Sequence, residues 1–77
     1  MNNILHEASR WLTDVGIATE FQGNCLAVKR TDVDSVIGGG PNEAALTLIN
    51  ELKSAVSKKL YWGGVSANDT WLYLESF

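Results

Sequence analysis

IATEFQGNCLAV, residues 17–28, has the pattern of a β-hairpin. Side chains alternate along both halves, and Gly23-Asn24 between them suits a two-residue turn that needs positive backbone φ angles. The register that follows joins three pairs: Gln22 with Cys25, Phe21 with Leu26, and Thr19 with Val28. Four apolar side chains then share one face of the sheet: Ile17, Phe21, Leu26 and Val28.

The segment before the hairpin predicts a helix over residues 3–15. Its apolar residues recur at intervals of three and four, which lines one side of an α-helix. They are Ile4, Ala8, Trp11, Leu12 and Val15. Gly16 supplies the left-handed residue that commonly ends a helix. His6, the only histidine, falls on the opposite, solvated side.

Residues 31–40 break both patterns, so we expect a surface connection there. Gly38–Gly40 stands just before a predicted helix, where backbone N–H groups can hold an anion. Pro41 and Glu43 follow these glycines in place of the Lys-Ser or Lys-Thr of a phosphate loop. A linker or a close-packed turn is therefore favoured over an anion site.

A second helix is predicted over residues 42–59, with Asn42 as its cap and Lys58 and Lys59 in its last turn. Its apolar residues again have helical spacing: Ala45, Leu48, Ile49, Leu52, Val56 and Leu60.

The tail, residues 60–77, predicts a second hairpin with its turn at residues 66–69. The elements then follow the order αββ-αββ. We expect one small α+β domain over residues 1–77, in which a four-stranded, largely antiparallel sheet carries two helices on one face.

Composition excludes several classes of protein. With 45% apolar and 19% charged residues, the 77-residue chain is expected to fold. A net charge of −3 opposes binding to nucleic acid. No segment is apolar enough to cross a membrane, and no secretory leader is evident. Cys25 is the only cysteine, so no disulfide can form within the chain. We therefore expect a cytoplasmic protein.

No motif for catalysis, a cofactor or a metal ion emerges. Cys25 and His6 are far apart in sequence, with nothing that predicts a nucleophilic pair. Asp32 and Asp34 in a glycine-rich segment are more often solvated side chains than hydrolytic carboxylates. We therefore expect a protein that is not an enzyme.

The aromatic residues of the tail are the candidate binding site. Two helices cannot cover both faces of a four-stranded sheet, and exposed tryptophan and tyrosine often dominate protein interfaces. If Leu72 and Leu74 face the helices, other side chains of the tail lie uncovered. The predicted partner-binding residues are Trp62, Trp71, Tyr73 and Phe77.

Two structural explanations for these aromatics stay open. They form the core face with the leucines outside, or Trp71 covers bare backbone at Gly63 or Gly64.

The leading functional hypothesis is a non-enzymatic module that binds a protein partner, as do small acidic inhibitors encoded by phages and mobile elements. That comparison rests on size and charge alone. The alternatives are an accessory protein for single-stranded nucleic acid and a small homo-oligomeric structural protein, such as a homodimer.

Overall fold

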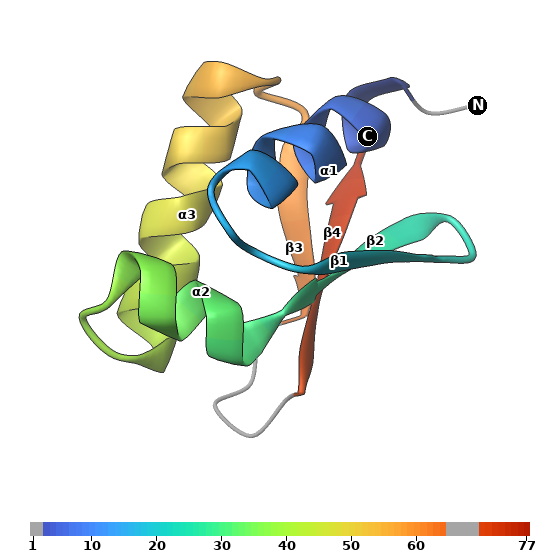
Figure 1. Cartoon of the computed structure of the whole chain (residues 1–77). Coiled ribbons are helices and arrows are strands. Elements are labelled where there is room, and N and C mark those ends of the chain that lie inside the picture. Colours follow the sequence, from blue (N-terminus) through green and yellow to red (C-terminus); the bar gives the residue numbers. More distant parts are fainter. Residues whose placement is uncertain (1–2, 65–69) are drawn as a thin grey trace.

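The computed structural model describes residues 3–64 and 70–77. Three helices and four strands make up this part of the chain: α1 (Asn3–Asp14), β1 (Thr19–Gln22), β2 (Cys25–Lys29), α2 (Arg30–Ile37), α3 (Pro41–Ala55), β3 (Leu60–Gly64) and β4 (Trp71–Ser76). The strands form one antiparallel sheet in the order β1-β2-β4-β3 (Figure 1). The predicted α+β class, with helices packed on a four-stranded sheet, is confirmed.

The first hairpin has the predicted register, with Thr19, Phe21 and Gln22 opposite the residues expected. Gly23 has a φ of 60° and Asn24 has a negative φ, which is the pattern of a type II′ turn. The predicted position of the turn and the predicted pairing of β1 with β2 are confirmed, but only Gly23 has the positive φ that was expected of the turn residues.

Helix α1 begins at the predicted residue and ends at Asp14. Leu5, Ala8 and Leu12 are buried on its inner side. Val15 was expected on that side but is 38% exposed, because the helix ends one residue before it and the chain turns toward Ile17.

The prediction of a surface connection over residues 31–40 was wrong, because residues 30–37 form helix α2. Val33 is fully buried and Ile37, four residues later, packs against the core. Gly38 follows with a φ of 78°, and its N–H donates to the Asp34 carbonyl at 3.0 Å. The helix thus ends at a residue type that adopts this conformation without strain.

Helix α3 is shorter than predicted and begins one residue earlier. Pro41 occupies its first turn and Gly40 is the N-cap, so Asn42 is not the cap. The helix ends at Ala55 rather than residue 59, which leaves Lys58 and Lys59 outside it.

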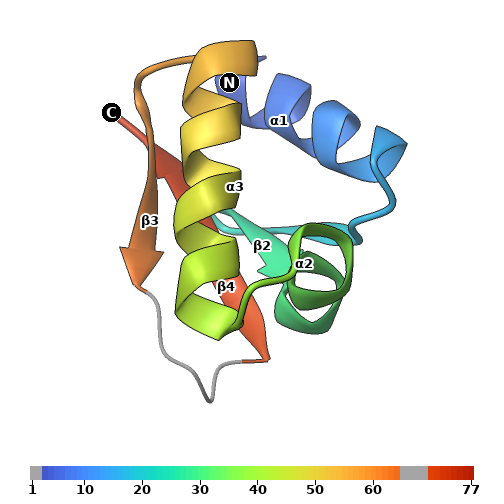
Figure 2. The same ribbon diagram turned by 90° about the vertical axis from the view of Figure 1, so that its left-hand side faces the viewer.

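All three helices pack on one side of the sheet. Figure 2 shows α3 in front of β4, with β3 on one side of it and α1 and α2 on the other. Leu72 and Leu74 of the central strand β4 are completely buried on this side, together with Leu26 and Val28 of β2. The alternative with the leucines outside is therefore wrong. The predicted turn at residues 66–69 lies outside the described residues.

Candidate functional site

The side of the sheet away from the helices carries most of the aromatic residues of the tail. Trp71 and Tyr73 alternate with the buried Leu72 and Leu74, so their half-buried side chains point to this opposite side. Tyr61 of β3 pairs with Glu75 and lies on the same side. We call this side the aromatic face, and its aromatic residues are Tyr61, Trp71, Tyr73 and Phe77.

Trp62 was predicted as a partner-binding residue, but the structure places it on the helix side of the sheet. It pairs with Leu74 and packs against the core. Its indole N–H donates to the carbonyl oxygen of Ala45 in α3 at 2.9 Å. Trp62 therefore joins β3 to α3 and is separated from the other three predicted residues by the sheet itself.

Tyr61 and Phe77 form a ring pair at one end of the aromatic face. Their ring centroids are 5.7 Å apart, with the planes tilted by 32°. The backbone N–H of Phe77 donates to the Lys59 carbonyl at 3.2 Å and extends the pairing of β3 with β4. Tyr61 is 37% and Phe77 79% exposed, so both rings remain open to contact from outside. Tyr61 was not among the predicted site residues, although its alternation with Leu60 and Trp62 was a usable signal.

A carboxylate lies within this aromatic group. The Glu75 side chain crosses β3 and occupies the space that a Cβ at position 63 would fill. Gly63 sits at an irregularity in the pairing of β3 with β4, where the register shifts between Trp62 and Gly64. The Glu75 side chain thus covers the backbone at Gly63. The absence of a side chain at this position is explained by Glu75, without the alternative in which Trp71 covers the backbone there.

The centre of the aromatic face is made of small residues. Ala27 is fully buried between its cross-strand neighbours Glu20 and Tyr73. Cys25 is half-buried, and its Sγ donates to the Gln22 carbonyl at 3.1 Å within the first hairpin. The aromatic rings therefore lie beside a shallow centre lined by small side chains, and they do not pack into a second hydrophobic core.

The residues considered for catalysis are not brought together. His6 lies on the helix side, where its ring contacts Phe21 at a centroid distance of 4.7 Å, whereas Cys25 faces the other side. No group of three His, Cys, Asp or Glu side chains in the described residues could hold a metal ion.

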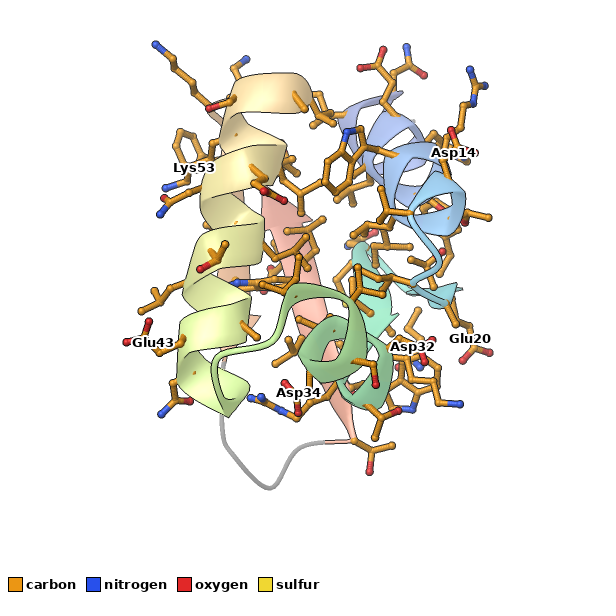
Figure 3. All side chains as sticks on the ribbon, turned by 60° about the vertical axis from the view of Figure 1, so that its left-hand side comes forward. Asp14, Glu20, Asp32, Asp34, Glu43 and Lys53 are labelled. Carbon is orange, nitrogen blue, oxygen red and sulfur yellow. The ribbon has the colours of Figure 1, made fainter. Side chains whose placement is uncertain are left out.

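Asp32 and Asp34 lie on different sides of α2 (Figure 3). Asp32 accepts a hydrogen bond from the backbone N–H of Ala18 at 3.0 Å, which fastens the start of β1 to α2. Asp34 lies 3.9 Å from the guanidinium of Arg30, a residue that is only 4% exposed. Both carboxylates therefore have structural contacts, and the burial of Arg30 keeps it from forming a basic surface patch with Lys29.

The Gly38–Gly40 segment connects α2 to α3. All three glycines have positive φ angles, so the turn depends on them. A Cβ at position 39 would lie 3.8 Å from that of Glu43, an acidic residue in the first turn of α3. This carboxylate repels an anion at the helix N-terminus, as the sequence suggested.

Two open grooves occur in the described part of the chain. One, of about 720 Å³, lies where the start of α1 meets the tip of the first hairpin, and His6 is its only titratable side chain. The other, of about 580 Å³, lies between α1 and α3 beside Trp11, with Glu51 as its only titratable side chain. Neither groove brings two titratable side chains together.

Within residues 3–64 and 70–77, no helix has the length and apolar character needed to cross a membrane. Comparison with known protein families, with curated proteins and with solved structures finds no match to this chain.

Proposed function

We propose that this chain is a non-enzymatic protein-binding domain that occupies a protein partner through its aromatic face, in the manner of a small inhibitor. The observation that carries the proposal is the position of Trp71 and Tyr73 on a central strand, on the side of the sheet that none of the three described helices covers. Tryptophan and tyrosine at such places contribute large contact areas and often dominate binding energy. The single free cysteine, half-buried Cys25, fits a reducing compartment such as the cytoplasm.

Single-stranded nucleic acid is a less suitable partner. Stacking platforms for unpaired bases are normally flanked by strong positive charge. Among the described residues, the aromatic face carries the carboxylates of Glu20 and Glu75 together with Lys29, and Lys59 lies opposite Phe77, so it has no excess of positive charge. These carboxylates repel a phosphate backbone.

Affinity capture from a lysate of the organism that encodes the chain tests the proposal. Three forms serve as bait: the wild type, the double variant Trp71→Ala/Tyr73→Ala, and Leu46→Ala as a matched control. Leu46 is 60% exposed on α3, so its change removes apolar surface from the helix side. We expect the wild type and the control to recover the same partner and the folded double variant to lose it. Equal recovery by all three forms rules out the aromatic face as the binding surface.

A further inference from the structure

The groove between α1 and α3 lies on the helix side of the sheet, away from the aromatic face. Trp11 is the residue of α1 that lines it. At about 580 Å³ the groove falls within the size range of small-molecule sites, about 300–1,000 Å³. Its other lining residues have the spacing that places side chains on one face of a helix, here α3. They are Thr47, Asn50, Glu51, Ser54 and Ala55.

Trp11 gives the groove an aromatic surface. Its side chain is half-buried, and it packs against the hydrophobic core as well as lining the groove. Thr47, Ser54 and Ala55 on α3 are small, which leaves space beside the ring. Tryptophan attracts ammonium groups to the face of its ring more strongly than tyrosine or phenylalanine does.

Glu51 is the only titratable side chain that lines the groove. It is exposed, and it forms no ion pair with a described residue. The cations nearest to it in the sequence are not in the groove. Figure 3 shows Lys53 pointing away from α1, and neither Arg10 nor Lys58 is a lining residue. A ligand in the groove therefore meets a carboxylate whose charge no lining residue balances.

The tryptophan ring and the carboxylate together favour one class of ligand. An anion is repelled by Glu51. A neutral apolar ligand takes water away from the carboxylate and gives it no counter-charge, which costs free energy. A cation is attracted by the ring of Trp11 and by the carboxylate of Glu51 at the same time.

We infer that the groove between α1 and α3 binds a small organic cation, whose compact apolar body carries an ammonium group placed against Trp11 and toward Glu51. The groove is open to solvent, so part of the ligand stays exposed and the affinity is expected to be millimolar. The site is separate from the aromatic face, and the inference goes beyond the proposed function without depending on it.

Choline provides the probe for this site. The control ligand is its isostere in which a neutral carbon atom replaces the charged nitrogen. Each is titrated into the ¹⁵N-labelled full chain at constant ionic strength. Binding is followed by NMR at the Trp11 indole and at the backbone amides of Ser54 and Ala55, and the Trp71 indole reports on the other side of the sheet.

Three variants test the two contacts. Trp11→Leu keeps an apolar side chain but removes the aromatic ring, and Glu51→Gln removes the charge. Glu43→Gln makes the same change in net charge at an exposed residue in the first turn of α3, outside the groove. Because Glu51 is exposed, Glu51→Gln keeps the fold and decides the test by itself if Trp11→Leu destabilises the core.

We expect choline to bind about fivefold more tightly than its isostere and to shift the Trp11 indole signal but not that of Trp71. Glu51→Gln and Trp11→Leu should each weaken choline binding about two- to fivefold, and Glu43→Gln should leave it unchanged. The inference is overturned if choline shifts none of the groove signals, if the isostere binds as tightly, or if Glu51→Gln behaves like Glu43→Gln. A shift of Trp71 with Trp11 unchanged also overturns it, because choline then binds the aromatic face.

Discussion

The same substitution at two tryptophans should have unequal effects on stability. Trp62→Phe removes the hydrogen bond from the indole to the Ala45 carbonyl, which contributes about 0.5–1.5 kcal/mol. It also replaces a large half-buried ring by a smaller one against the core, at a cost of about 1 kcal/mol. We therefore expect Trp62→Phe to lower the free energy of unfolding by about 1.5–2.5 kcal/mol.

Trp71→Phe is the matched change on the other side of the sheet. The Trp71 indole makes no hydrogen bond to the described residues, and none of the described helices packs against it. We therefore expect Trp71→Phe to lower the free energy of unfolding by less than about 0.5 kcal/mol. Urea unfolding followed by far-UV circular dichroism measures both, since the signal does not depend on the tryptophan that is replaced. With a slope near 1 kcal/mol per molar urea, the midpoint should fall by about 1.5–2.5 M for Trp62→Phe. Equal midpoints for the two variants would refute the assignment of Trp62 to the core and Trp71 to the surface.

Three further changes test the scaffold by urea unfolding. Val33→Ala should lower the free energy of unfolding by about 2 kcal/mol because Val33 of α2 is fully buried. Val36→Ala on the same helix should lower it by less than about 0.5 kcal/mol because Val36 is 43% exposed. Similar losses for the two variants would contradict the packing of α2. Asp32→Ala should cost about 1 kcal/mol by leaving the Ala18 N–H without its acceptor, and Asp32→Asn should recover part of that; no effect of Asp32→Ala would contradict the contact. Gly38→Ala should cost about 1–2 kcal/mol because a side chain is strained at its φ of 78°, and an unchanged midpoint would place the end of α2 elsewhere.

The first hairpin was predictable to the residue because two local signals agree. Alternation gives the strands, and Gly23-Asn24 fixes the turn and with it the register of Thr19 against Val28. No tertiary information is needed for this element. The alternation of Leu72 with Trp71 and Tyr73 was also visible, and it correctly divided β4 into two faces, but it left open which of the two faces is buried.

Other elements depend on contacts that are distant in sequence. Helix α2 has eight residues, too few for a clear pattern, and it is stabilised by packing of Val33 rather than by its own propensity. Leu60 continues the helical spacing of α3 but is used as the first residue of β3, because the sheet buries it completely. The position of Glu75 over Gly63 follows from the irregular pairing of β3 with β4 and has no signal in the sequence.

The three tryptophan indole groups provide the most direct measurement of the central claim, because each reports on a different part of the molecule. Trp71 lies on the aromatic face, Trp62 between β3 and α3, and Trp11 beside the groove between α1 and α3. Two-dimensional ¹H–¹⁵N NMR resolves their indole signals in the full chain, before and after the captured partner is added. We predict that the Trp71 signal shifts or broadens while those of Trp62 and Trp11 stay in place. A shift of Trp11 or Trp62 with Trp71 unchanged would contradict the assignment of the aromatic face as the binding surface.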